Sequence, residues 1–174
     1  MQIGTELVEA KTLDEALASI VRHLGTDTGT VHFLAEDGLL HLAAATPGLP
    51  EVVLSTIKAI PVGKGMAGLA VERRRPVDAC NIQTDRSGDV RPGARATGLA
   101  GAVVVPIFRD ADVIGALGVA NRGERTFSEA ETRDLIEAGR TLAGLVPTPP
   151  SRDSHLPRFD AARVVDRQRL DVGR

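Results

Sequence analysis

The sequence has very few aromatic residues and a single cysteine. Its 174 residues include no tryptophan or tyrosine and only four phenylalanines. Sites that stack bases use aromatic rings, so such sites must be few here, and a cyclic nucleotide is an unfavoured ligand. The lone Cys80 cannot form a disulfide within the chain or build a thiolate metal cluster. Redox chemistry by a pair of cysteines in one chain is therefore excluded.

A strong net charge and long apolar runs are also missing. The formal net charge is −2, which gives no electrostatic attraction for nucleic acid or an anionic membrane. No apolar run approaches the ~20 residues that a membrane span needs, and the first residues lack the basic-then-apolar order of a secretory signal. We therefore expect a cytoplasmic protein that binds neither nucleic acid nor membrane.

Apolar periodicity and turn residues predict a series of helices and hairpins. Capping boxes open helices at Thr12 and Ser128, and a short helix begins at Pro50. Apolar runs separated by tight turns predict two β-hairpins, over residues 30–46 and 100–121. In the first hairpin we expect residue 32 to face 42 and residue 33 to face 41. The first and last helices are expected to share one face of an antiparallel sheet, which gives an α+β fold.

Two segments lack this periodicity. Residues 81–99 are rich in turn formers and charge and predict a long mobile loop. From Pro147 onward, prolines are frequent and large apolar residues are too few for a core. We predict one ligand-binding domain over residues 1–146 and a disordered Pro/Arg-rich tail over 147–174.

Several motifs of the body resemble the GAF family. These are IPVGKGMAGLAVERRRPVDACNI from Ile60, then AVVVPIFRDADVIGALGVAN, then FSEAETRDLIEAGRTLA. The resemblance covers roughly residues 10–146. It implies a central antiparallel sheet with helices on one face and a lidded ligand pocket on the other.

The resemblance also implies a range of functions. GAF domains bind cyclic nucleotides, tetrapyrroles, haem, small anions or amino-acid derivatives, and they commonly form dimers. We therefore expect a homodimer that regulates a partner such as a kinase or a transcription regulator. The resemblance names no cofactor.

One sub-motif partly matches the cyclic-nucleotide branch of the family. It comprises Asn121, Arg122 where that branch has lysine, Phe127, and Glu131 at its aspartate position, whereas Thr132 replaces the final glutamate. We expect a structural role for these residues, with an Arg122–Glu131 ion pair tying the last strand to the final helix.

Two further branches of the family depend on cysteine. Methionine sulfoxide reductases of this fold need several cysteines, one of them beside the glycine-rich helix start, which here reads Gly65 to Gly68. Bilin-binding members use a lid cysteine with a nearby histidine, and no histidine occurs between residues 42 and 154. Neither activity is expected.

The leading candidate site is the glycine-rich segment before the predicted third helix. Backbone amides and a lysine at a helix N-terminus attract phosphate, nitrate or carboxylate, although these glycines could instead serve only a tight turn. Arginines of the 81–99 loop could close over the anion. The predicted ligand-binding residues are Val62, Gly63, Lys64, Gly65, Met66, Ala67, Arg86, Arg91 and Arg95.

Other chemically active residues have no evident catalytic arrangement. His23, His32 and His41 lack metal-ligand spacing, and His32 and His41 are expected on opposite faces of the hairpin. Cys80 is expected to be a packed residue, with a redox-sensitive thiol as the alternative. The sequence contains no serine elbow, HExxH helix or Walker loop. We therefore expect no metal site and no enzymatic activity.

Three functional hypotheses follow. The first is a sensory domain that binds a small, anionic ligand and acts on a separate partner protein. The second is a degenerate GAF domain that serves as an adaptor and binds its partner through the tail. The third is a haem or redox sensor.

Overall fold

The computed structural model describes Ile3, Leu7 and residues 9–147. Of the predicted tail, all but Pro147 lies outside the described residues. In chain order the elements are α2 (Leu13–Leu24), β1 (Thr28–Leu34), β2 (Leu39–Ala45), α3 (Glu51–Ile57), β3 (Ala59–Pro61), α4 (Gly65–Arg73), β4 (Val77–Ala79), the 3-10 helix η1 (Pro92–Thr97), β5 (Ala102–Arg109), β6 (Asp112–Ala120) and α5 (Glu129–Gly144).

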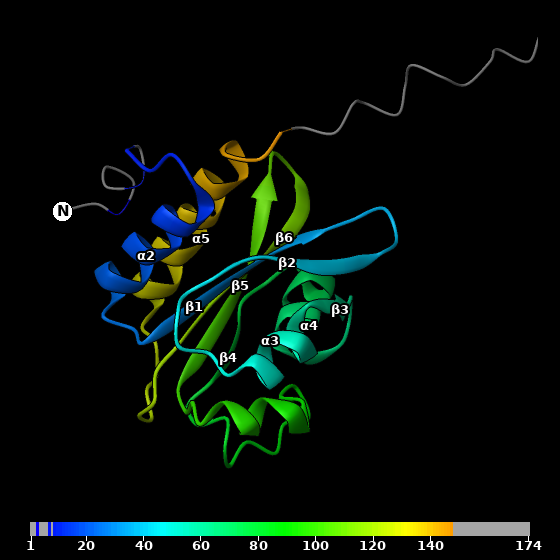
Figure 1. The fold of residues 1–174 in the computed structure, drawn as a ribbon, viewed down its shortest axis with the longest axis vertical. Helices are drawn as coiled ribbons and strands as arrows, with labels where there is room; N and C mark the ends of the chain where they lie inside the picture. Colours follow the sequence, from blue (N-terminus) through cyan, green and yellow to red (C-terminus); the bar gives the residue numbers. More distant parts are fainter. Residues whose placement is uncertain (1–2, 4–6, 8, 148–174) are drawn as a thin grey trace, which may run out of the picture.

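The strands form one six-stranded antiparallel sheet in the order β3-β2-β1-β6-β5-β4. Both predicted hairpins are present, as β1–β2 and β5–β6 (Figure 1). The predicted register of the first hairpin is confirmed, since His32 pairs with Leu42 and Phe33 pairs with His41. The predicted fold class, an antiparallel α+β domain, is confirmed.

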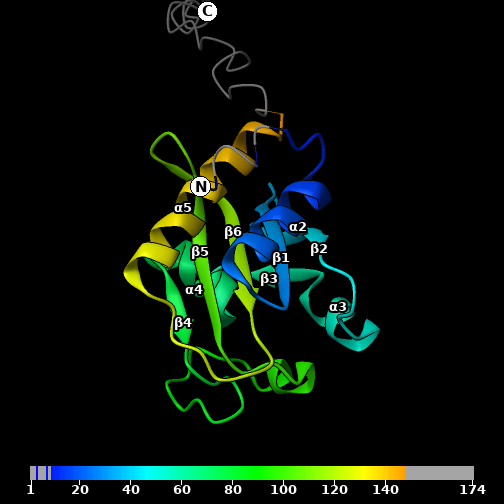
Figure 2. The same cartoon turned by 90° about the vertical axis from the view of Figure 1, so that its left-hand side faces the viewer.

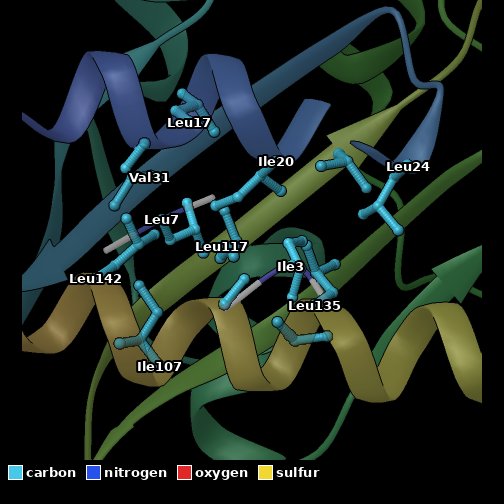
Figure 3. Close-up of a cluster of buried hydrophobic side chains, with 14 of the residues drawn as sticks. Ile3, Leu7, Leu17, Ile20, Leu24, Val31, Ile107, Leu117, Leu135 and Leu142 are labelled. Atoms are coloured by element: carbon cyan, nitrogen blue, oxygen red, sulfur yellow. The ribbon is translucent and has the colours of Figure 1, made fainter. Parts of the chain in front are cut away.

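The two terminal helices of the described chain, α2 and α5, pack side by side on one face of the sheet (Figures 1 and 2). Alternate residues of the strands meet them there, because successive side chains of a strand point to opposite faces. Figure 3 shows the resulting core, in which Leu17, Leu117 and Leu142 are fully buried. Val31 and Ile107 come from the sheet side of this layer.

Helix caps explain where α2 and α5 begin. Ser128 and Glu131 form a complete capping box, as predicted. At α2 the Thr12 hydroxyl accepts a hydrogen bond from the Glu15 N–H, but the Glu15 carboxylate accepts one from Lys11 N–H instead of closing the box on Thr12. Both caps satisfy amides that the first helical turn leaves free.

The apolar residues of α5 do not all face the core, although the sequence pattern predicts this for Ala130, Leu135, Ala138, Leu142 and Leu145. Leu135, Ala138 and Leu142 are buried and Leu145 is half-buried. Ala130, in contrast, is exposed. It lies in the first turn of α5, before the helix reaches the sheet.

The opposite face of the sheet carries α3, α4 and the segment 81–99. Leu40, Ile60, Val71 and Ala116 form one small apolar cluster there. A second cluster joins Ile82 and Leu99 of the 81–99 segment to the ends of β4, β5 and β6. No helix among the described residues combines the length and apolar character required to cross a bilayer.

Candidate functional site

The glycine-rich segment bends sharply between β3 and α4. Gly63 and Gly65 have positive φ angles of 82° and 62°, a conformation that other residues adopt only with strain. Gly68 lies in α4, and a side chain there would overlap the Pro61 carbonyl oxygen. The glycines thus bring the start of α4 close to the end of β3.

A cavity of about 380 Å³ opens between the sheet, α3, the start of α4 and the 81–99 segment. Its floor comes from β1, and its walls come from α3 and from the first turn of α4. The lining residues are Thr30, His32, Val53, Thr56, Ile57, Ile60, Lys64, Gly65, Met66, Ala67, Val90, Arg91, Pro92, Gly93, Ala94 and Thr97.

A smaller cavity of about 140 Å³ adjoins the first. The two share Thr30, Val53, Ile57, Met66 and Thr97 as lining residues. The smaller one continues along the sheet toward apolar side chains of the second cluster. Its further lining residues include Leu49, Ile82, Leu99 and Val104.

The two charged residues that line the larger cavity, Lys64 and Arg91, are both positive. Lys64 is the N-cap residue of α4, and Arg91 comes from the 81–99 segment. The aliphatic part of Arg91 lies against Gly65, where an added side chain would be 2.9 Å from Arg91 Cδ. Of the described residues that line the cavity, none is aspartate or glutamate. The helix N-terminus adds partial positive charge to the same end of the cavity.

His32 lies at the cavity floor and is almost completely buried, with 2% exposure. Its Nε2 lies 2.9 Å from the Ile57 carbonyl oxygen, and because a carbonyl only accepts, Nε2 carries the proton. Burial lowers the pKa of His32, and the bond to Ile57 only partly opposes this. The ring is therefore neutral at pH 7, and its Nδ1 remains a hydrogen-bond acceptor. The Nε2–Ile57 bond leaves His32 Nε2 engaged instead of free to ligate a metal.

This burial predicts a pH dependence of stability. The unfolded chain takes up a proton on His32 near its ordinary pKa of 6.5, but the folded chain does so only at lower pH. The free energy of unfolding should therefore fall as the pH drops below 6.5, by at most about 1.4 kcal/mol per pH unit from this group. His32→Gln keeps an N–H donor for Ile57 and should flatten this slope in urea denaturation series. His41→Gln, at an exposed position, should keep the slope; equal slopes for wild type and His32→Gln would contradict the prediction.

The 81–99 segment contains the 3-10 helix η1 and is held by side-chain hydrogen bonds, where the sequence predicted a mobile loop. The Gln83 side-chain amide donates to the carbonyls of Arg95 and Leu99 at 3.2 and 2.7 Å. Arg73 of α4 holds Asp89 through two hydrogen bonds of 2.8 and 3.0 Å, and this contact keeps the pKa of Asp89 below its ordinary value. We call residues 81–99 the lid, because they cover one side of the cavity.

Only part of the predicted site lines the cavity. Lys64, Gly65, Met66, Ala67 and Arg91 lie together there, as one group from α4 and the lid. The other four predicted residues are outside the lining: Val62, Gly63, Arg86 and Arg95. Val62 precedes the bend and is 38% exposed. Arg95 turns away to the Asp85 carbonyl at 3.4 Å.

The floor of the cavity and its α3 wall were not predicted from the sequence. Thr30 and His32 stand two residues apart on β1, and alternation in a strand places both on the face opposite α2 and α5. That alternation was visible in the sequence. The contribution of Val53 and Ile57 from α3 was not, because it depends on where the short helix packs.

The expected Arg122–Glu131 ion pair is wrong, because Arg125 takes that place. Arg125 Nη2 lies 2.6 Å from Glu131 Oε1, and its guanidinium also covers the Phe127 ring at 4.6 Å. Arg122 is exposed, and its backbone N–H donates to Asp27 at 2.8 Å. The turn after β6 points Arg122 outward and returns Arg125 toward α5.

Arg125 connects four parts of the fold. Besides Glu131, its guanidinium donates to the carbonyls of Leu24 and Gly25, at the C-terminal end of α2, at 2.8 and 3.0 Å. It also donates to the Asn121 side chain at 3.1 Å. Its backbone N–H donates to the carbonyl of Cys80, just before the lid, at 3.2 Å. Cys80 itself is exposed, so the prediction that it is a packed residue is wrong.

The chain matches a known sequence family, and several solved structures have a similar fold. The sequence model of the GAF domain matches residues 7–145. A search of curated proteins found no match. Among solved structures, the GAF domain of the Acinetobacter phosphoenolpyruvate-protein phosphotransferase is similar, with a TM-score of 0.67 and 21% identity over 82% of this chain and 87% of that one.

Two other similar structures come from proteins of different kinds. One is a domain from a Sinorhizobium meliloti protein described as a two-component sensor histidine kinase, with a TM-score of 0.59 and 18% identity over 74% of this chain and 84% of that one. The other is the free methionine-R-sulfoxide reductase from Neisseria meningitidis in complex with its substrate. It has a TM-score of 0.65 and 20% identity over 82% of this chain and 83% of that one.

The reductase overturns our prediction that the chain has no enzymatic activity. Further free methionine-R-sulfoxide reductases, from Staphylococcus aureus and Thermoplasma acidophilum, share the fold. An architecture of this kind therefore supports catalysis. The lack of common catalytic motifs was not sufficient ground for the prediction, because such motifs belong to other folds. Within the described part of the chain, no three histidine, cysteine or acidic side chains form a possible metal site.

Proposed function

Since the chain belongs to the GAF domain family, whose members are small-ligand sensory and regulatory domains, we propose that it binds a small anion in the cavity under the lid and regulates a separate partner protein. The observation that carries this proposal is the cavity of about 380 Å³ with Lys64 and Arg91 at its edge. A concave, mostly apolar site with a few convergent polar groups is typical of small-molecule binding.

Hydrogen bonds through Glu124 and Arg125 connect the start of the lid to α2 and α5, and they support a route for the signal. The lid begins at Asn81, whose side-chain amide donates to Glu124 at 2.6 Å, beside the Cys80–Arg125 bond. Arg125 in turn holds the end of α2 and the start of α5. A ligand that shifts the lid would therefore act on the pair of helices on the far face of the sheet.

The terminal helices are the surface that we propose for output. In this proposal the chain is a cytoplasmic homodimer that pairs through α2 and α5, with residues 1–146 as the ligand-binding domain. The partner is a regulatory protein such as a kinase or a transcription regulator.

Filling the cavity should abolish ligand binding without unfolding the protein. Thr30 is half-buried and lines both cavities, so Thr30→Phe places a ring in their shared space. β-Strands accept phenylalanine readily, so the variant should keep its circular dichroism spectrum. In a thermal-shift screen of organic anions, hits on the wild type should raise Tm by several degrees at about 100 times Kd. Thr30→Phe should lose those shifts.

The matched control is Thr84→Phe, which adds the same ring to an exposed lid position outside the cavity lining. It should retain every shift. Equal shifts for wild type and Thr30→Phe would place binding elsewhere and contradict the proposal.

A further inference from the structure

We propose that the cavity selects an organic carboxylate with an apolar body and no ammonium group, and so discriminates against free amino acids. This inference rests on the proposed function and specifies the ligand class. It draws on three features of the site: the sign of its charges, the position of nearby acidic groups, and the apolar continuation of the cavity.

The cationic end of the cavity suits a single carboxylate. Lys64 and Arg91 reach it from two different elements, the start of α4 and the lid. Neither side chain forms a hydrogen bond or an ion pair with any residue that the structure describes, whereas Arg73, Arg95, Arg109 and Arg125 are each engaged elsewhere. A charge-assisted bond to a carboxylate would be new to both.

Among the described residues, no acidic side chain lines the cavity. In the lid, Asp85 accepts hydrogen bonds from the N–H and the hydroxyl of Ser87, and Asp89 holds Arg73 with both oxygens. The Glu72 carboxylate of α4 lies against Gly63, 2.8 Å from the position of a side chain added there, and is also outside the lining. The α-ammonium of an amino acid would therefore lie beside two cations with no carboxylate in the lining to bind it, which is unfavourable.

The far end of the site suits an apolar tail. Val53, Ile57, Ile60 and Met66 line the larger cavity with apolar surface. Beyond them the smaller cavity continues between Leu49, Ile82 and Leu99. A body of several carbons can extend from the cationic end into this space, and burial of its apolar surface there favours binding.

Three ligands with one body separate charge from shape. 3-Phenylpropanoate carries the carboxylate alone, phenylalanine adds the ammonium group, and 3-phenylpropanamide has neither charge. Isothermal titration calorimetry of the full chain should give a Kd for the carboxylate at least about tenfold below those of the other two. The aliphatic pair 4-methylpentanoate and leucine should repeat the order. Binding of the amino acids as tight as that of the carboxylates, or no carboxylate binding at millimolar concentration, would overturn the proposal.

Variants test whether the two cations cause the preference. Lys64→Gln and Arg91→Gln should each weaken carboxylate binding by about tenfold and leave amide binding unchanged. Lys58→Gln and Arg86→Gln remove the same charges at exposed positions outside the lining and should have little effect. If the control variants lost as much carboxylate affinity, general surface charge would explain the preference for carboxylates. That result would contradict the roles of Lys64 and Arg91.

The outcomes also separate this inference from the proposed function. Tight amino-acid binding that Thr30→Phe abolishes would leave the cavity as the ligand site and reject only the ligand class. No binding by any compound of the wider screen would reject both.

Discussion

Replacing Gly68 with alanine should lower the free energy of unfolding by about 2–4 kcal/mol. The added methyl group would overlap the Pro61 carbonyl oxygen and would lie 3.1 Å from the Gly63 nitrogen. Both neighbours are backbone, so no side chain can rotate away. The overlap can be relieved only by moving α4 away from β3, and this movement breaks the hydrogen bond from the Gly63 N–H to the Gly68 carbonyl at 2.9 Å.

The same movement should damage the site. The first turn of α4 supplies Lys64, Met66 and Ala67 to the cavity, so a displaced helix changes its cationic end. Urea denaturation of Gly68→Ala, together with its carboxylate affinity, checks both effects. Gly144→Ala is the control, because a side chain at this position in the last turn of α5 meets nothing within 4 Å. It should be neutral or slightly stabilising. A loss below about 1 kcal/mol for Gly68→Ala would show that the close approach is not a constraint.

The fold was predictable to a large extent because local patterns and global architecture agree. Apolar runs indicated the strands, the Asp37–Gly38 turn between two of these runs indicated the register of the first hairpin, and the Ser128 capping box marked the start of α5. Each signal acts over a few residues and needs no knowledge of the tertiary structure.

The site was predictable only in part because it depends on contacts between distant segments. The glycine-rich start of α4 has a local signature, and it does line the cavity. No local signature in the sequence shows which arginine of the lid turns toward the cavity. Arg91 lies against Gly65, whereas Arg95 turns to the Asp85 carbonyl and Arg86 lies outside the lining. Within a loop that lacks periodicity, no sequence rule distinguishes these three.

The choice of Arg125 over Arg122 has the same origin. Both arginines follow β6 at positions compatible with an ion pair to Glu131. The path of residues 121–127 is fixed by the Asn121 backbone bonds to Ala100 and Gly101 and by the Asp27 carboxylate, which binds the Arg122 N–H. These partners are far away in the sequence, so motif comparison alone selected the wrong residue.

Replacing Arg125 with methionine should lower the free energy of unfolding by about 3 kcal/mol. Methionine keeps much of the aliphatic length but donates nothing, so the carbonyls of Leu24 and Gly25 lose their partners at the end of α2. Glu131 keeps its bond to the Ser128 N–H but loses the guanidinium. The side chain of Arg125 is 24% exposed, and water can replace only part of these bonds.

Two variants show whether this loss comes from the fork geometry of arginine. Arg125→Lys keeps the positive charge but cannot reach the α2 carbonyls and Glu131 together, so it should recover less than half of the lost stability. Arg122→Met, three residues away and exposed, should change stability by less than about 0.5 kcal/mol. Equal losses at 122 and 125 in urea denaturation would contradict the role of Arg125.

The acid dependence of stability provides an independent readout of the Arg125–Glu131 contact. The Ser128 backbone N–H and then Arg125 hold the pKa of Glu131 below its ordinary value of 4.5. The ionised Glu131 therefore contributes its full stabilisation above pH 4.5, and this contribution is lost as the pH falls through the lowered pKa. Removing Arg125 should raise that pKa and reduce the loss of stability in acid. If Arg125→Met left the acid limb unchanged, the stability difference would have to arise from packing instead of from the ion pair.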